Sequence, residues 1–286
     1  MKNKAIAQLP INIIETVQYA LEEDIGTGDI TAQLIPEHQQ ATAQVITRED
    51  MTICGIAWFD ETFKQLDQNI KINWFVEDGE EVIVNQTLCE LEGNARVLLT
   101  GERAALNFLQ LLSATATQTQ RYVQQVKHTK TAVLDTRKTI PHLRTAQKYA
   151  VTCGGGSNHR IGLFDAFLIK ENHIMAAGSI QKAVARAKQV ANLPVQIEVE
   201  DIDEVQQALN AGADRLLLDN FDLDMLREAV QLVDGRAKLE ASGGINLNTI
   251  QAIAETGVDF VSVGAITKDI KAIDLSMRIS HIAENA

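Results

Sequence analysis

The chain contains few of the residues that mark several large classes of protein. Only 3 of its 286 residues are cysteine (Cys54, Cys89 and Cys153), widely spaced and without a CxxC pair. This excludes a disulfide-stapled scaffold and gives no zinc-ligand spacing, so the simplest prediction is a reducing, cytoplasmic compartment. Aromatic residues make up only 5% of the chain, and 38 acidic residues against 26 basic ones give a net charge of −12. Few stacking platforms and a repulsive charge argue against nucleic-acid binding.

Long hydrophobic runs are also missing from the sequence. No segment approaches the roughly 18 to 20 apolar residues that a membrane-spanning helix needs. Residues 1–15 include two lysines but no continuous apolar stretch, which argues against a signal peptide. Apolar residues nevertheless make up 45% of the chain, enough for a sizeable core. The sequence therefore predicts a soluble protein of one large domain or two modest ones, with no membrane partner.

The first hundred residues have the pattern of a small α+β module. Residues 12–22 carry apolar side chains at helical spacing. Short β-like runs follow at 44–48, 70–75, 80–84 and 87–93. The Asp78-Gly79 pair is typical of a hairpin turn between two of these runs, and Thr100 is a candidate N-cap for a long helix over 101–127. We expect an N-terminal α+β domain over residues 1–112, to which a C-terminal helix over 272–286 could be added.

From residue 131 onward a strand–loop–helix rhythm repeats. Six apolar runs of strand length occur at 132–135, 165–170, 195–200, 215–220, 237–242 and 259–264. Amphipathic helical stretches separate them, at 179–191, 202–211, 222–232 and 246–256. Because apolar runs without polar alternation are typical of buried parallel strands, we expect an α/β fold, an open and incomplete (β/α) barrel over residues 113–271. A doubly wound open sheet is the alternative, disfavoured because no GxGxxG follows a first strand.

Polar residues occur where all six predicted strands end, which is the edge that carries catalytic groups in a barrel. They are Asp135-Thr136-Arg137-Lys138, Lys170-Glu171-Asn172, Glu198 with Glu200, Asp219-Asn220, Glu240-Ala241-Ser242-Gly243-Gly244 and Gly264-Ala265. One such terminus alone would be read as a loop or a helix cap. Six of them in one layer indicate an active site.

Basic residues gather in one part of this acidic chain. Between residues 133 and 173 lie Arg137, Lys138, Arg144, Lys148, Arg160 and Lys170, with His142, His159 and His173. Focused positive charge in a negative protein indicates a site for a small polyanion, and arginine binds carboxylate or phosphate in a bidentate manner. Arg144 and Lys148, spaced i and i+4, are expected instead on a solvated helix face over 142–150.

Glycine-rich turns and carboxylates add phosphate and metal chemistry. Ser242-Gly243-Gly244 precedes a predicted helix and Gly264 ends the next strand, and the last two loops of a barrel often hold a phosphate. Asp219 and the glutamates offer the oxygen ligands that magnesium prefers. The alternative is that these carboxylates pair with Lys170 and Arg137 for structure alone.

Together these segments resemble the quinolinate phosphoribosyltransferase family, also called decarboxylating nicotinate-nucleotide pyrophosphorylases. The resemblance is carried by EDIGTGDIT (23–31), LTGERAALNFLQLLSATAT (99–117), LDTRKTIPHLR (134–144), CGGGSNHRIGLFDAFLIKENHI (153–174), IEVE (197–200), LLLDN (216–220), EASGGIN (240–246) and VSVGAIT (261–267). They span nearly the whole chain in the family's order. A relative linked to molybdenum transport shares this framework, but DTRKT and NHR resemble the quinolinate branch. The resemblance implies an N-terminal α/β domain, a seven-stranded open barrel and a homodimer.

The resemblance also implies a role for each site residue. The two carboxylates of quinolinate would be bound by Arg137, His159 and Arg160, with Lys138 and Lys170 alongside. Glu200 and Asp219 would face the ribose hydroxyls and Mg²⁺, the metal being held through substrate and water. The 5-phosphate would be held by Ser242, Gly243, Gly244 and Gly264. Lys138, Lys170, Glu200 and Asp219 are the implied catalytic residues. Arg103, which the Thr100 cap places in the first helical turn, would reach into the neighbouring subunit's site.

The implied reaction joins quinolinate to phosphoribosyl pyrophosphate, releasing pyrophosphate and carbon dioxide and leaving nicotinate mononucleotide for NAD biosynthesis. Because loss of pyrophosphate leaves an oxocarbenium-like carbon, no protein nucleophile is needed, and none of the usual Ser-His-Asp or Cys-His patterns is expected. Two other function classes stay open. One is an aldolase or isomerase acting on a phosphorylated metabolite, with Lys170 as a Schiff-base lysine, and the other is a non-catalytic anion-binding protein.

Overall fold

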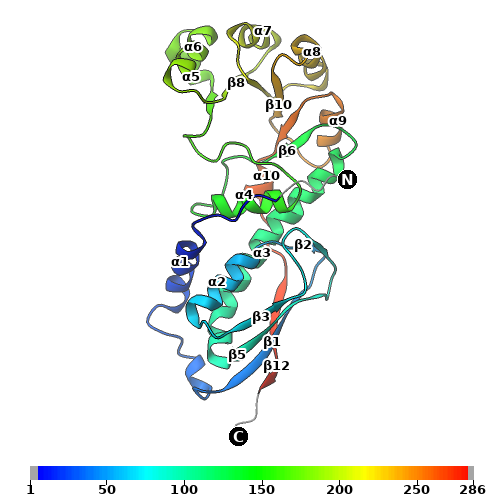
Figure 1. Ribbon diagram of the computed structural model, residues 1–286. Coiled ribbons are helices and arrows are strands. Elements are labelled where there is room, and N and C mark those ends of the chain that lie inside the picture. The colour runs from blue at the N-terminus through cyan, green and yellow to red at the C-terminus, as the bar shows by residue number, and fades with distance from the viewer. Residues whose placement is uncertain (1–5, 283–286) are drawn as a thin grey trace. The chain divides into compact units, whose positions relative to one another are not determined.

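The computed structural model describes residues 6–282 and divides into two compact units (Figure 1). Unit 1 takes residues up to 120, 140–155 and from 269 onward, and unit 2 takes residues 121–139 and 156–268. Each unit is therefore built from segments that are distant in sequence. The outermost parts of the predicted N-terminal domain and C-terminal helix, residues 1–5 and 283–286, lie outside the described residues. Among residues 6–282, no helix combines the length and apolarity needed to cross a membrane.

Unit 1 is built on a four-stranded antiparallel sheet in the order β12-β1-β5-β3. Its strands are β1 (Gln40–Thr47), β3 (Lys71–Trp74), β5 (Thr87–Asn94) and β12 (Leu275–Ile282). A second, two-stranded sheet pairs β2 (Met51–Thr52) with β4 (Glu81–Val82). The helical elements are α1 (Ile13–Ile25), η1 (Ala32–Leu34), α2 (Ile56–Leu66), most of α3 (Ala95–Val126) and α4 (Arg144–Cys153). Alternate side chains of β1 are buried, which confirms an α+β unit with one covered sheet face.

The C-terminal segment is a strand, so the prediction of a helix over 272–286 is wrong. Residues 275–282 form β12, which pairs antiparallel with β1 along its length. Leu275 and Met277 are buried while Ser276 and Arg278 between and beyond them are more exposed. This alternation has a period of two residues, which fits the pleat of a strand and not the turn of a helix.

Asp78-Gly79 does not form the predicted hairpin. The strands on either side pair elsewhere, β3 with β5 and β4 with β2. The Asp78 carboxylate instead accepts hydrogen bonds from the backbone N–H groups of Gly55 and Ile56 (2.9 and 3.2 Å), at the start of α2. An acidic side chain there satisfies N–H groups that the helix itself leaves without partners. The turn residues therefore serve a helix end rather than a strand pair.

Helix α3 begins before the predicted cap. The Asn94 Oδ1 accepts from the backbone N–H groups of Arg96 and Val97 (2.9 and 3.4 Å), whereas Thr100 lies inside the helix and donates to Asp29 Oδ2 at 2.9 Å. One face of the helix is apolar: its side chains are partly buried at Val123 and buried at Leu106, Leu109, Leu112, Ala116 and Val126. Arg103 consequently lies beyond the first two turns on an exposed position, and its predicted place in the first turn is wrong.

Unit 2 is a six-stranded parallel sheet in the order β6-β11-β10-β9-β8-β7. The strands are β6 (Ala132–Leu134), β7 (Phe167–Ile169), β8 (Val195–Val199), β9 (Arg215–Asp219), β10 (Lys238–Ser242) and β11 (Phe260–Ser262). The helices between them are α5 (Glu171–Ala177), α6 (Ile180–Val190), α7 (Ile202–Ala211), α8 (Leu223–Val233), α9 (Ile250–Glu255) and α10 (Ala265–Lys268). All six strands and the four helical stretches predicted from periodicity are confirmed.

The seventh strand that the resemblance implied is reduced to one residue pair in the described chain. Ser157 forms a single parallel bridge with Leu134 of β6. The Ser157 N–H donates to the Val133 carbonyl at 2.8 Å, and the Asp135 N–H donates to the Ser157 carbonyl at 3.2 Å. The glycine run just before Ser157 supplies no side chains to pack as a strand, so the pairing stops there.

The predicted solvated basic face over 142–150 is wrong for Lys148. Helix α4 is buried almost all round, and the Lys148 side chain is only 2% exposed. Its neighbours Tyr149 and Ala150 belong to an apolar cluster that includes Trp58 of α2 and Phe108 of α3. A helix enclosed in this way offers no polar face to solvent.

Candidate active site

The carboxyl ends of the parallel strands in unit 2 bring the predicted polar residues to one edge of the sheet. Ser242, the last residue of β10, lies in register with Asp219, the last residue of β9. Lys170 follows β7 directly, and Glu200 follows β8. Because the strands are parallel and adjacent, side chains that are distant in sequence meet at this edge.

Two arginines converge near the β6 end of this edge. Arg137 follows β6, and Arg160 lies in the loop before β7, both partly buried. Burial lowers the pKa of the Arg160 guanidinium, and the positive charge of Arg137 lowers it further, while Asp165 acts in the opposite direction. Two like charges held together in a partly desolvated place create a strong local preference for an anion.

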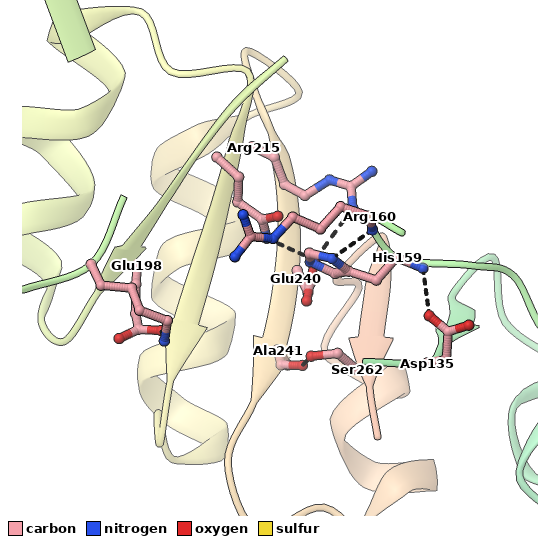
Figure 2. Close-up of polar contacts among 10 residues, drawn as sticks. Asp135, His159, Arg160, Glu198, Arg215, Glu240, Ala241 and Ser262 are labelled. Carbon is pink, nitrogen blue, oxygen red and sulfur yellow. Dashed lines mark hydrogen bonds and ion pairs between the residues drawn. The ribbon is translucent and has the colours of Figure 1, made fainter. Parts of the chain in front are cut away.

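His159 is held on three sides by the protein (Figure 2). Its ring Nε2 lies 3.4 Å from Glu240 Oε2, and its Nδ1 accepts the backbone N–H of Arg160 at 2.8 Å. Its own backbone N–H donates to Asp135 Oδ1 at 2.8 Å. Asp135 and Glu240 are both fully buried. The segment that carries Arg160 is therefore fixed from within the unit.

Lys138 lies against Gly264, at the end of the strand that neighbours β6. A Cβ atom on Gly264 would lie 3.1 Å from Lys138 Cδ and 3.6 Å from Thr136 Oγ1. The Thr267 hydroxyl also donates to the Lys138 carbonyl at 2.8 Å. The structure thus brings the DTRK loop and the Gly264 turn together, with the Lys138 side chain exposed.

Acidic groups crowd around Lys170 on the other half of the edge. Lys170 Nζ forms an ion pair with Glu198, the residue two before Glu200 on β8. The pKa of Asp219 is raised by burial and by Glu198, against the opposing charges of Lys170 and Lys138. The pKa of Glu200 is also raised, first by desolvation and then by Glu171, Glu204, Asp219 and Glu198. A cavity of about 280 Å³ adjoins this group, lined by Glu171, Ile174, Met175, Glu198, Glu200 and Glu204.

Gly243 occupies a place that no other residue fits. Its φ is +101°, and a Cβ atom there would lie 2.1 Å from Asn220 Oδ1. The Asn220 N–H donates to the Ser242 carbonyl at 2.9 Å, which ties the end of β9 to the end of β10. Gly244, with φ +58°, has nothing within 4 Å of its Cβ position. The turn is packed on one side and open for a ligand to approach its backbone on the other.

Comparison with known proteins decides which family this geometry belongs to. The model of the C-terminal domain of quinolinate phosphoribosyl transferase matches residues 115–278, and the model of its N-terminal domain matches residues 29–113. The chain belongs to the quinolinate phosphoribosyltransferase family.

Individual members of the family match over four fifths or more of their own length. A protein of Bacillus subtilis described as a probable nicotinate-nucleotide pyrophosphorylase (carboxylating) is 40% identical over 260 residues, 90% of each chain. A mitochondrial quinolinate phosphoribosyltransferase of Nicotiana glauca is 38% identical, covering 93% of this chain and 81% of its own. The solved nicotinate-nucleotide pyrophosphorylase of Francisella tularensis is 53% identical and superposes with a TM-score of 0.94 over 97% of this chain and 99% of that one.

The sequence pattern placed three charged residues at the strand ends without indicating what each of them does. Asp135 and Glu240 were noted only as strand-end residues, and Glu198 only as a neighbour of Glu200. The sequence does hold one indication of their role. A charged residue within or at the end of an otherwise apolar strand is buried only when it has hydrogen-bonding or charged partners. Arg103 belongs to unit 1, and its place in a neighbouring subunit's site stays a prediction.

Proposed function

We propose that this pentosyltransferase transfers the phosphoribosyl group of phosphoribosyl pyrophosphate to the ring nitrogen of quinolinate, with loss of carbon dioxide, to give nicotinate mononucleotide for NAD biosynthesis. The observation that carries the proposal is the pair of converging guanidinium groups, Arg137 and Arg160, in a chain that belongs to this family. Quinolinate brings two adjacent carboxylates, which are the ligands that such a pair of planar cations accepts.

The remaining cations of the edge extend this cradle. Lys138 is exposed beside Gly264, and Lys170 is half-exposed at the end of β7, so both can reach a bound anion. His159 lies next to Arg160 and belongs to the same loop. In an acidic chain, this concentration of positive charge favours a small dianion over a large acidic surface.

Phosphoribosyl pyrophosphate binds at the other half of this sheet edge, where the acidic residues and the glycine-rich turns lie. Glu200 and Asp219 face the ribose hydroxyl groups as hydrogen-bond acceptors. The backbone N–H groups around Ser242, Gly243, Gly244 and Gly264 bind the 5-phosphate, as glycine-rich turns before helices do. The open side of Gly244 supports this assignment.

Magnesium fits the donor set of this site. The Glu198 carboxylate raises the pKa of both Glu200 and Asp219, and Asp219 also raises that of Glu200; a divalent cation relieves this repulsion between carboxylates. Glu200 and Asp219 would hold Mg²⁺ through substrate oxygens and water. When bound, the ion neutralises charge on the departing pyrophosphate.

The side chains catalyse the reaction by electrostatics. As the bond from ribose C1 to pyrophosphate breaks and the quinolinate nitrogen bonds to C1, Glu200 and Asp219 stabilise the positive charge on the ribose. Lys138 and Lys170 stabilise the negative charge on the leaving group. The C2–carboxylate bond then breaks, carbon dioxide departs, the pyridinium holds the electron pair at C2, and a proton from water completes the product. No protein nucleophile takes part.

We propose that the active protein is a homodimer in which Arg103 of one chain enters the active site of the other chain. Arg103 is exposed on α3, with Asn107 exposed one turn further along the same helix. An exposed cation can contact an anion bound by a second copy.

We assign the protein to the cytoplasm because its three cysteines are free thiols, which a reducing compartment maintains. Some plant relatives are named as mitochondrial or chloroplastic.

Turnover with quinolinate, phosphoribosyl pyrophosphate and Mg²⁺, with chromatographic detection of nicotinate mononucleotide, tests the proposal. The aldolase alternative requires the Lys170 amine to attack a carbonyl carbon, whereas in this structure Lys170 Nζ is held in an ion pair with Glu198. Borohydride trapping with a phosphorylated carbonyl substrate should therefore leave the mass of the protein unchanged. A mass increase at Lys170 without nucleotide formation would favour the aldolase.

A further inference from the structure

The imidazole of His159 uses both ring nitrogens on the protein itself. Nδ1 is the acceptor of the Arg160 backbone N–H at 2.8 Å. Nε2 is 3.4 Å from the carboxylate oxygen Oε2 of Glu240. The side chain of His159 is only 8% exposed, and Figure 2 shows the ring between Glu240 and the backbone of Arg160.

This arrangement fixes the protonation of the ring. A nitrogen that accepts an N–H hydrogen bond carries no proton, so Nδ1 is bare. A carboxylate accepts and does not donate, so the single ring proton lies on Nε2, which faces Glu240. His159 is therefore the neutral Nε2–H tautomer and has no second N–H to offer to a substrate carboxylate.

Glu240 is built into the sheet as a fixed anion. It is fully buried on β10, and its Oε2 also accepts from Gln196 Nε2 at 2.7 Å and Arg215 Nη1 at 3.3 Å. Arg215 in turn lies 4.2 Å from the ring centre of Phe260, which holds the guanidinium in place. Burial acts to raise the pKa of Glu240, but the interactions with His159, chiefly the hydrogen bond from its ring, together with the hydrogen bonds from Ser262 and Gln196, outweigh burial and lower the pKa.

We propose that Glu240 and His159 are positioning residues for Arg160. Glu240 fixes the ring of His159, the ring fixes the Arg160 backbone N–H, and Asp135 fixes the His159 N–H from the other side. The guanidinium of Arg160 is thereby held beside Arg137 before any substrate arrives. This inference rests on the proposed function, because Arg160 is taken to bind a carboxylate of quinolinate. The direct contacts with the quinolinate carboxylates are then made by the arginines and lysines, and His159 acts only by holding Arg160 in place.

A double-mutant cycle on the full-length protein tests the link between Glu240 and Arg160. Glu240→Gln keeps the size of the side chain but removes the charge that orients the imidazole. We expect it to weaken quinolinate binding by about 5- to 50-fold, the range for losing one partner of a buried hydrogen-bonded network. Phosphoribosyl pyrophosphate binding should change less than about twofold. In the Arg160→Ala background the same change should have almost no further effect on quinolinate, because the two residues act in series.

A matched control exists in the same unit. Glu255 also pairs with a histidine, His128, at 3.0 Å, but both side chains are about half exposed on the surface. Glu255→Gln removes the same kind of pair and should leave quinolinate affinity unchanged. Thermal unfolding of each variant separates a loss of positioning from a loss of fold.

The tautomer provides a readout that needs no variant at Glu240. Protein labelled with ¹⁵N-histidine should give a His159 signal with a protonated Nε2 and a bare Nδ1 at neutral pH, identified by its loss in His159→Gln. This pattern should persist when quinolinate is added.

Three results would overturn the inference. A doubly protonated or Nδ1-protonated His159 would remove its basis. Additive effects of Glu240→Gln and Arg160→Ala would show that Glu240 does not act through Arg160. Equal losses for both substrates would indicate a purely structural role. Absence of any turnover or quinolinate binding by the wild-type protein would instead overturn the proposed function, and this inference with it.

Discussion

At the scale of single residues, Arg137 and Arg160 carry the central part of the proposed function, because they bring two positive charges together at one end of the site. Both are partly buried, and the charge of Arg137 lowers the pKa of Arg160. If they bind the two carboxylates, Arg→Ala at either position should weaken quinolinate binding by about 2–4 kcal/mol, the scale for removing one partner of a desolvated charge pair. Calorimetric titration measures this. Phosphoribosyl pyrophosphate affinity should change far less.

An exposed arginine of the same unit is the control for that experiment. Arg227 pairs with Asp224 at 2.7 Å on the surface of α8. Arg227→Ala should leave both affinities unchanged because exposed pairs contribute little. Equal losses for the two substrates in Arg137→Ala or Arg160→Ala would contradict the assignment.

The acidic pair should behave differently from the arginines. Glu200→Ala and Asp219→Ala should leave quinolinate binding intact, because their partners are the ribose and its metal. Turnover should fall and the magnesium concentration for half-maximal rate should rise. Steady-state rates over a magnesium series measure both. Wild-type turnover together with unchanged metal dependence would make these residues structural.

Gly243 offers a test of the phosphate turn. Gly243→Ala adds a Cβ that meets Asn220 Oδ1 at 2.1 Å and also strains a backbone with φ +101°. Gly235 has φ +74° but nothing within 4 Å of its Cβ position, so Gly235→Ala isolates the backbone strain, about 1 kcal/mol. Chemical denaturation should show a larger loss for Gly243→Ala, and only this variant should lose phosphoribosyl pyrophosphate affinity. Equal behaviour of the two variants would rule out a special role for the turn.

At the scale of elements, the parallel sheet could be predicted and the ends of several other elements could not. The six strands of unit 2 are apolar because they are buried on both faces, so the pattern is strong and local. Strand β12 was missed because its pairing partner β1 lies more than 200 residues away, and only that pairing turns alternation into a strand. The start of α3 was missed because both Asn94 and Thr100 are good N-cap residues, and the sequence does not show that Thr100 hydrogen-bonds to Asp29.

Part of the candidate site could likewise be predicted from the sequence, and part could not. Arg137, Lys170, Asp219 and the glycine turns lie at or just after strand ends, so their position is implied by the topology, whereas Arg160 lies in the loop before β7. Glu198, Glu240 and Asp135 act through partners on other strands or loops, and these pairings exist only once the sheet is assembled. Glu240, for example, joins His159, Gln196 and Arg215 from three separate segments.

The cap of α3 gives a prediction at this scale. Asn94→Ala removes the acceptor for the N–H groups of Arg96 and Val97 and should lower the free energy of unfolding by about 1 kcal/mol. Asn94→Ser keeps an acceptor for these N–H groups without placing a carboxylate against the Glu37 carbonyl, to which Asn94 Nδ2 donates at 2.6 Å, and should retain most of the stability. Urea denaturation measures both. A loss for Asn94→Ser as large as that for Asn94→Ala would show that the acceptor is not what stabilises this helix end.

At the scale of the whole molecule, the proposal requires sites shared between two copies of the chain. Arg103→Ala and Lys138→Ala should each be inactive alone, because each removes one cation from every site. Mixing them under conditions that allow subunit exchange should restore activity toward about a quarter of wild type, since half the dimers are mixed and half of their sites are intact. Light scattering and native mass spectrometry confirm the exchange. No recovery in exchanged dimers would place Arg103 in its own chain's site or in none.

The reaction itself tests the central claim most directly. Wild-type protein is supplied with quinolinate carrying ¹³C in the 2-carboxylate, phosphoribosyl pyrophosphate and Mg²⁺, and the products are followed by chromatography and mass spectrometry. We expect nicotinate mononucleotide, pyrophosphate and labelled carbon dioxide in equal amounts, with no label left in the nucleotide. Absence of the nucleotide, or a nucleotide that retains the labelled carboxylate, would contradict the account.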